Sequence, residues 1–170
     1  MIKIAIVDDN LFLQKTVQEK LSFFEDVEIK SKSLNGKELL QKLEKNSNLD
    51  LILMDIEMPE MNGVETTAEV KKRYPHIKIL MLTVFDNDEK IFKSIKAGAD
   101  GYLLKEINPQ ELYNSIKETL SGGAAMTPSI ALKTLKLLRE PQVFETEEEK
   151  EKITLHNSCI LILRLEICFE

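Results

Sequence analysis

Short apolar runs alternate five times with segments of helical periodicity along the first 122 residues. This order of strand and helix predicts a parallel sheet wrapped by helices, because parallel strands need a crossover connection between them. The runs predict strands over residues 2–7, 27–32, 50–54, 77–82 and 100–104.

The apolar runs differ in ways that predict their positions in the sheet. The first, third and fourth runs, IKIAIV, LILM and IKILML, are almost continuously apolar, as expected for central strands covered on both faces. The second, VEIKSK, alternates apolar and polar residues and is typical of an edge strand.

Apolar spacing and boundary residues predict the intervening helices. Asn108-Pro109 has the form of an N-cap followed by a first-turn proline, and Gly98 and Gly122 are placed at helix ends. The predicted helices cover residues 11–24, 36–45, 63–73, 87–97 and 109–120.

A second segment follows the small residues Ser121-Gly122-Gly123. Thr127-Pro128 offers another N-cap and first-turn proline, and apolar spacing predicts a short helix over 128–138. The stretch 145–152 is mostly charged and typical of a solvated linker, and the final residues form an apolar tail, ILILRLEICFE.

Composition narrows the function classes. The chain has 170 residues, 43% hydrophobic and 31% charged, with a net charge of −6. This balance argues against broad nucleic-acid binding, which needs a basic face. The N-terminus lacks the pattern of a signal sequence, and no run approaches the roughly 20 apolar residues of a membrane span. We expect a cytoplasmic protein without membrane contact, in which Cys159 and Cys168 are free thiols.

Chemically active side chains stand at the carboxyl ends of four predicted strands. These are Asp8 and Asp9, Asp55, Thr83 and Lys105. Because the carboxyl ends of parallel strands share one edge of the sheet, where α/β folds place their sites, we expect three carboxylates, a hydroxyl and an ammonium to meet there.

Each of these residues also has a structural interpretation when it is taken alone. Asp8 and Asp9 could cap the following helix, Thr83 could be an ordinary strand residue, and Lys105 a solvated charge. Asp55 could be a loop carboxylate. Their joint occurrence favours a site, because helix capping does not require the other three positions.

The segments that carry these residues resemble a known family. IAIVDDN, LILMDIEMPEMNG, ILMLTV and GADGYLLKE, in this order, resemble the receiver domain of two-component response regulators. The resemblance covers residues 1–122 and implies a flavodoxin-like, doubly wound sheet of five parallel strands, (βα)5, with a C-terminal helical linker and a short tail. GYLLKE and the helix at 128–138 look like those of LuxR/NarL-type regulators.

The resemblance implies roles for the site residues. Asp55 is the phosphoacceptor and receives its phosphoryl group from a sensor histidine kinase. Asp9 and Asp55 ligate Mg²⁺ directly, Asp8 acts through water, and the Glu57 backbone carbonyl is a further ligand. An acidic cluster with an open side suits Mg²⁺, and the cation reduces the repulsion between a carboxylate and an incoming phosphoryl group.

The resemblance also implies a switch. Lys105 and Thr83 contact the phosphate, and Thr83 moves inward while Tyr102, at the aromatic switch position, fills the vacated space. The surface around 85–120 then changes and can mediate a homodimer.

Other residues around the site have smaller roles. Glu57 and Phe85 match positions that tune dephosphorylation. Gly63 is expected to supply a backbone angle that other residues resist. Glu106 stands where many receivers have proline, so a cis bond is not expected there.

The predicted organisation is a receiver at 1–122, a linker helix at 123–145 and an acidic linker with an apolar tail at 146–170. The tail has the character of a truncated or frame-altered helix-turn-helix domain, so DNA binding requires that domain in the intact protein.

Two functions compete for this organisation. One is a phosphorylation-dependent transcription regulator, which is no enzyme beyond its own phosphorylation and dephosphorylation. The alternative is a receiver-only module acting through protein contacts. A metal-dependent phosphatase ranks third.

Overall fold

Five parallel strands form one sheet in the order β2-β1-β3-β4-β5 in the computed structural model, which describes residues 1–84 and 87–139. Each predicted strand is present to within one residue at either end. The strands are β1 Ile2–Val7, β2 Val27–Ser33, β3 Leu51–Met54, β4 Lys78–Thr83 and β5 Gly101–Leu104. The alternating strand β2 lies at an edge and β1, β3 and β4 are central, as predicted.

Six helices accompany the strands in the described residues. The first of them ends earlier than predicted, at Leu21, because Ser22 forms the C-cap. Phe24 lies beyond it and stacks on the Tyr113 ring at 4.0 Å, so its apolar character serves a contact with another helix. The helices are α1 Leu11–Leu21, α2 Gly36–Lys45, α3 Gly63–Arg73, α4 Asp88–Lys96, α5 Pro109–Leu120 and α6 Pro128–Arg139.

Asparagine N-caps define where the first five helices begin. In each case the asparagine side chain accepts hydrogen bonds from backbone N–H groups of the first turn, which otherwise have no partner in the helix. The caps are Asn10, Asn35, Asn62, Asn87 and Asn108. The predicted Asn108 cap and the proline after it are confirmed. Gly98 and Gly122 follow α4 and α5 with φ of 98° and 93°, which confirms that they end helices.

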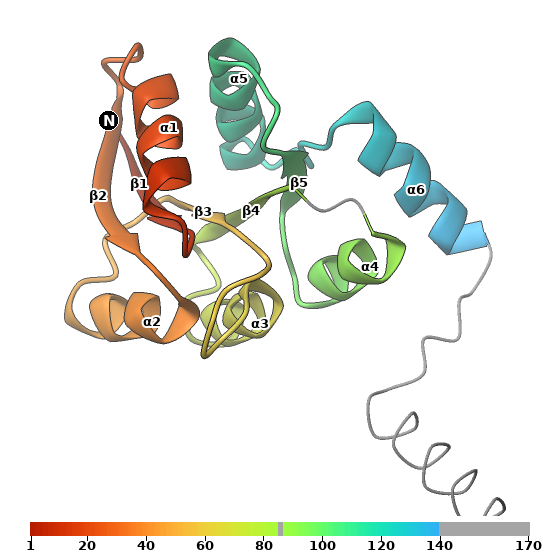
Figure 1. Cartoon of the computed structure of the whole chain (residues 1–170), viewed down its shortest axis with the longest axis horizontal. Coiled ribbons are helices and arrows are strands. Elements are labelled where there is room, and N and C mark those ends of the chain that lie inside the picture. The colour runs from red at the N-terminus through yellow and green to blue at the C-terminus, as the bar shows by residue number, and fades with distance from the viewer. Residues whose placement is uncertain (85–86, 140–170) are drawn as a thin grey trace, which may run out of the picture. The chain divides into compact units, whose positions relative to one another are not determined.

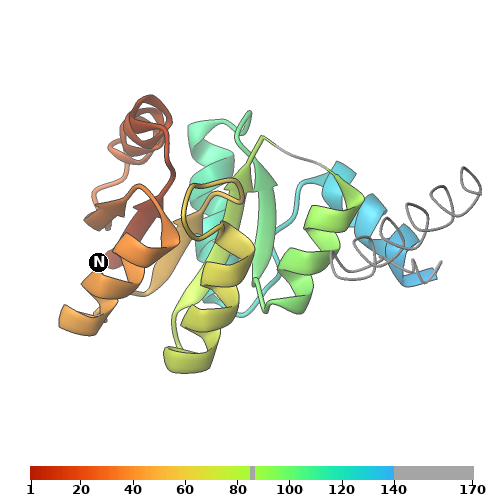
Figure 2. The same cartoon turned by 60° about the horizontal axis from the view of Figure 1, so that its bottom comes forward.

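Helices cover both faces of the sheet. Helices α1 and α5 lie over one face, and α2, α3 and α4 over the other (Figures 1 and 2). Successive strand residues point to opposite faces, so Ile4 and Ile6 join the core under α1 and α5 while Ala5 and Val7 face the other layer. This double burial explains the continuous apolar runs and confirms the flavodoxin-like class.

The segment after α5 runs beside the outer edge of β5. The Tyr102 backbone N–H donates to the Ala125 carbonyl at 2.9 Å, and the Thr127 N–H donates to the Tyr102 carbonyl at 3.3 Å. Helix α6 follows and packs beside α4. None of the helices in residues 1–84 and 87–139 is long and apolar enough to cross a bilayer. The predictions for Cys159, Cys168 and the segment 146–170 lie outside the described residues.

Candidate functional site

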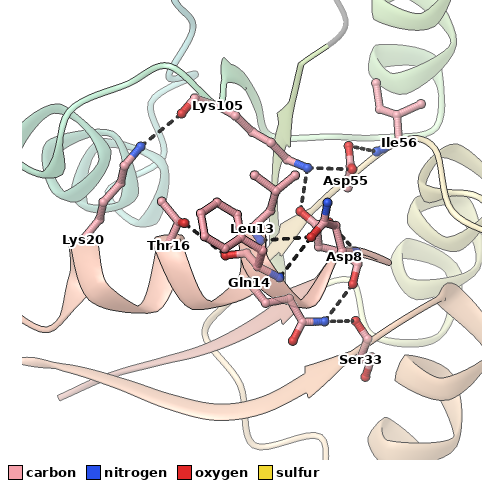
Figure 3. Close-up of polar contacts among 11 residues, drawn as sticks. Asp8, Leu13, Gln14, Thr16, Lys20, Ser33, Asp55, Ile56 and Lys105 are labelled. Atoms are coloured by element: carbon pink, nitrogen blue, oxygen red, sulfur yellow. Dashed lines mark hydrogen bonds and ion pairs between the residues drawn. The ribbon is translucent and has the colours of Figure 1, made fainter.

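The residues singled out at the strand ends meet at one edge of the sheet. The Lys105 ammonium lies between two of the carboxylates, with its Nζ 2.5 Å from Asp8 Oδ2 and 2.7 Å from Asp55 Oδ2 (Figure 3). The side chain of Lys105 is only 7% exposed. A buried lysine paired with two aspartates rules out the interpretation of Lys105 as a solvated surface charge.

Three carboxylates of this edge form a compact oxygen cluster. One oxygen each from Asp8, Asp9 and Asp55 lies within 4.8 Å of the others. Asp8 and Asp55 are buried, whereas Asp9 is exposed, so the cluster has one side open to solvent. The spacing and the hard oxygen donors fit a small divalent cation that retains water ligands.

The end of β1 positions Asp8 through its backbone and its side chain. The Asp8 N–H donates to the Ser33 carbonyl at 3.1 Å, and Asp8 Oδ1 accepts the Asn10 N–H at 3.0 Å. Below them, the buried Gln14 amide donates to the carbonyls of Asp8 and Ser33 at 2.7 and 2.9 Å (Figure 3). Because Asn10 is the N-cap of α1, the capping interpretation of Asp8 and Asp9 is wrong.

The loop from β3 to α3 positions Asp55. Its N–H donates to the Val7 carbonyl at 2.9 Å, and its Oδ1 accepts the N–H of Ile56 at 2.7 Å. The start of α3 closes on this loop, since the Gly63 N–H donates to the Ile56 carbonyl at 2.8 Å. A Cβ on Gly63 would lie 1.9 Å from the Asp55 carbonyl oxygen.

Gly63 is therefore needed for close approach. The expectation that it supplies an unusual backbone angle is wrong, because among the described glycines only Gly98 and Gly122 have positive φ. Glu60 has the positive φ in this loop, at 66°.

The residues predicted to form the switch lie in the adjoining strands. Thr83 ends β4 and is fully buried, and its carbonyl accepts the Lys105 N–H at 2.9 Å. Tyr102 is 1% exposed, so its ring lies inside the protein. Glu57 is exposed and pairs with Lys90 of α4. Phe85 lies outside the described residues.

The site has more negative than positive charge. Burial raises the pKa of the Asp8 carboxyl, although hydrogen bonds from Lys105 and the Asn10 N–H work in the opposite direction. Lys105 supplies one positive charge against the three carboxylates. A divalent cation would balance the remaining charge and lower the cost of burying Asp8 and Asp55.

Sequence reasoning missed two residues that support this site, Gln14 and Lys20. Gln14 is 3% exposed and shares the buried face of α1 with Val17 and Leu21, so its helical spacing was a usable signal. Lys20 contacts a loop 85 residues away, and nothing local in the sequence indicates that contact.

Comparison with known proteins places the chain among signalling proteins. Residues 4–117 match the family described as "Response regulator receiver domain". The chain is 35% identical over 150 residues to the transcriptional regulatory protein DegU of Brevibacillus brevis, covering 88% of this chain and 62% of that protein. It is 33% identical over 157 residues to the response regulator protein VraR of Staphylococcus aureus, covering 91% of this chain and 75% of that protein.

A solved structure shows the same fold. The two-component response regulator of the LuxR family from Aurantimonas superposes with a TM-score of 0.74 at 25% identity, covering 81% of this chain and 98% of that one. In this chain the matched residues form the sheet described above, and they include the acidic cluster and the lysine between Asp8 and Asp55. The chain therefore belongs to the response regulator receiver domain family.

Proposed function

We propose that Asp55 accepts a phosphoryl group from a sensor histidine kinase in a Mg²⁺-dependent reaction, and that the resulting change of state controls an output. The chain is a two-component response regulator receiver related to transcriptional regulators. The observation that carries the proposal is the buried Lys105 ammonium, which bridges Asp8 and Asp55 next to the exposed Asp9.

The proposed phosphoryl transfer is a single displacement at phosphorus. A carboxylate oxygen of Asp55 forms a bond to the phosphorus of an N-phosphohistidine as the P–N bond breaks. The electron pair of that bond returns to the imidazole, which takes up a proton from solvent. The products are the acyl phosphate of Asp55 and a neutral histidine.

The protein contributes charge and positioning to this step, which are the main means of catalysis in phosphoryl transfer. The Lys105 ammonium lies 2.7 Å from Asp55 Oδ2 and is placed to contact the oxygens of the arriving phosphoryl group. The Thr83 hydroxyl, at the end of the neighbouring strand, would donate to the same phosphate.

Asp9, Asp55 and the Glu57 carbonyl would hold Mg²⁺ directly. Asp8 would contact the cation through water, as the resemblance to receiver domains implies, while its two carboxylate oxygens accept hydrogen bonds from Asn10 and Lys105. When bound, the cation would neutralise charge between the carboxylate and the phosphoryl oxygens.

We further propose that residues 1–122 act as the receiver, 123–145 as the linker and 146–170 as part of the output region. Regulation of transcription is the favoured output, because DegU is a transcriptional regulatory protein. A response through protein contacts is the second candidate, since Leu132, Leu135 and Leu138 of α6 are exposed. Specific binding of the purified chain to DNA would decide for the first.

Substitution of the acceptor tests the central proposal. The chain is incubated with acetyl phosphate and Mg²⁺, and its mass is measured. We expect one added phosphoryl group in the parent and none in Asp55→Asn, because an amide is a far weaker nucleophile.

The control is Asp50→Asn, at the opposite end of β3, where an amide oxygen can still accept the Lys3 N–H. We expect this variant to be labelled like the parent. Chelation of Mg²⁺ should prevent labelling of both the parent and Asp50→Asn. Full labelling of Asp55→Asn would show that the acceptor is another residue.

A further inference from the structure

Lys20, in the last turn of α1, reaches the loop that carries Lys105. Its Nζ donates to the Lys105 carbonyl at 3.1 Å and to the Ile107 carbonyl at 2.7 Å. The first of these contacts spans the gap between α1 and the loop after β5 (Figure 3). A single ammonium thus holds the carbonyl of the site lysine and a second carbonyl two residues further along the loop.

The loop is held at both ends by other contacts. The Lys105 N–H bonds to Thr83 of β4, and the Ile107 N–H bonds to the Leu104 carbonyl at 3.3 Å. Asn108 caps α5 in a reciprocal pair with Glu111. Between these anchors, residue 106 is a glutamate, whose φ is not restricted as that of a proline would be. None of the peptide bonds in the described residues is cis. Lys20 adds a constraint from α1 on the two carbonyls on either side of residue 106.

The charge on Lys20 is kept at a cost. Burial lowers the pKa of this ammonium, because the charged form loses water. Among the described residues, no carboxylate lies within ion-pairing distance of Lys20, in contrast to Lys15, five residues earlier in the same helix, which pairs with Glu19. Its donors are used on backbone carbonyls. Because these carbonyls carry no net charge, the contacts do not neutralise the ammonium, and their main effect is to fix the geometry of the loop.

We propose that Lys20 is a positioning residue for Lys105. Its ammonium fixes the backbone on the carbonyl side of Lys105 and thereby the position from which the Lys105 side chain extends. A lysine side chain has four rotatable bonds, so its ammonium can be placed to a few tenths of an ångström only if its backbone is fixed. The N–H of Lys105 is held by β4 and its carbonyl by α1. Together these contacts keep Nζ between Asp8 and Asp55. The proposal rests on the proposed role of Asp55 as phosphoacceptor.

The test compares three variants of the full chain, Lys20→Met, Lys20→Arg and Lys15→Met. Phosphorylation by acetyl phosphate is followed over a range of donor concentrations at fixed Mg²⁺. Because Lys105 contacts the group in transfer, its displacement should act mainly on the transition state. We expect Lys20→Met to lower the maximal rate constant about 10-fold and to change the half-saturating donor concentration by less than about twofold.

The other two variants separate positioning from charge and from stability. Lys20→Arg retains a cation with several donors and should recover most of the rate. Lys15→Met removes an exposed lysine from the same helix and should behave like the parent. All rates are measured well below the unfolding transition of each variant. If Lys20→Met does not fold, Lys20→Gln, which retains an amide donor but is shorter, replaces it, and the same loss in the maximal rate constant is expected.

The outcomes distinguish this inference from the proposed function. Phosphorylation of the parent with an unchanged maximal rate in Lys20→Met overturns the positioning role and leaves the role of Asp55 standing. A loss confined to the half-saturating concentration also overturns it. Failure of the parent itself to be phosphorylated on Asp55 removes the proposed function, and the inference with it.

Discussion

Gly63→Ala should perturb the acceptor more than any conservative change outside the cluster itself. Gly63 is the first residue of α3 and lies directly against the loop that carries Asp55. The added Cβ would meet the Asp55 carbonyl oxygen at 1.9 Å, the Asp55 carbonyl carbon at 2.9 Å and Ile56 Cα at 3.0 Å. All three are backbone atoms, so no side-chain rotation relieves the contact.

The size of the effect follows from the distance that must be gained. The Cβ and the carbonyl oxygen must separate by about 1 Å to reach the shortest contact that real Cβ atoms make. Overpacking of this kind costs about 1–3 kcal/mol, and the lower entropy of the unfolded alanine chain offsets about 0.4–1 kcal/mol. The difference spans about 0–2.6 kcal/mol, and because all three contacted atoms are backbone we expect its upper part, a net loss of about 1–2.6 kcal/mol in the free energy of unfolding.

The same displacement should slow phosphorylation. Moving a reacting group by about 1 Å can cost up to about 100-fold in rate, and we expect a loss of at least about 10-fold for Gly63→Ala. Unfolding in urea is followed by circular dichroism, because the chain has no tryptophan. Phosphorylation by acetyl phosphate is measured on the same samples.

Gly36→Ala is a matched control. Gly36 is likewise the first residue of a helix after an asparagine cap, and its added Cβ would meet Thr66 Oγ1 at 1.8 Å. That contact is with side-chain atoms, which can move at the loss of one hydrogen bond, worth about 1 kcal/mol. We expect no change in phosphorylation rate. Parental stability and rate in Gly63→Ala would refute the close approach of α3 to Asp55.

Two further predictions concern Asp100, before the start of β5 and at the opposite end of the sheet from the site, and Gln14, which supports Asp8. Burial disfavours the Asp100 carboxylate, but hydrogen bonds from Lys71, the Ile79 N–H and Lys78 outweigh it and hold its pKa below the usual value. The stabilisation it gives is therefore present above its unfolded pKa of about 3.9 and is lost as the pH falls through the lower folded pKa. Asp100→Asn should cost about 1–3 kcal/mol at neutral pH, and the difference from the parent should shrink near pH 3 in urea titrations; a constant difference would contradict this. Gln14→Leu removes the donor to the Asp8 and Ser33 carbonyls and should cost about 1–3 kcal/mol in the same assay, whereas parental stability would show that water replaces the amide.

The fold was predictable because local and global signals agree in this chain. Continuous apolar runs mark β1, β3 and β4, and the alternation in VEIKSK marks the edge strand β2. The helix that was overextended, α1, shows the limit of periodicity. Phe24 continues the apolar spacing, yet its ring is used against Tyr113 of α5 after the helix has ended. Spacing along one segment carries no information about such contacts.

Those residues of the candidate site that directly follow strands could be predicted from the sequence. Asp8, Asp9, Asp55 and Lys105 converge because parallel strands place their carboxyl ends together. Gly63 shows what the sequence could not supply. A glycine after a loop suggests an unusual φ, whereas the structure requires it for the approach of two backbones, which is a property of the packed fold.

Helix α1 supports both partners of the ion pair between Asp8 and Lys105. Gln14, near its start, holds the backbone of Asp8, and Lys20, near its end, holds the backbone of Lys105. The 2.5 Å pair between Asp8 and Lys105 is therefore tied at both residues to one rigid element. Asp55 is held separately, by β1 through the Val7 carbonyl and by the start of α3. A phosphoryl group arriving on Asp55 would thus meet an ammonium whose position is set by α1, which is why a substitution on that helix, remote in sequence from Asp55, is the sharpest probe of how the site is organised.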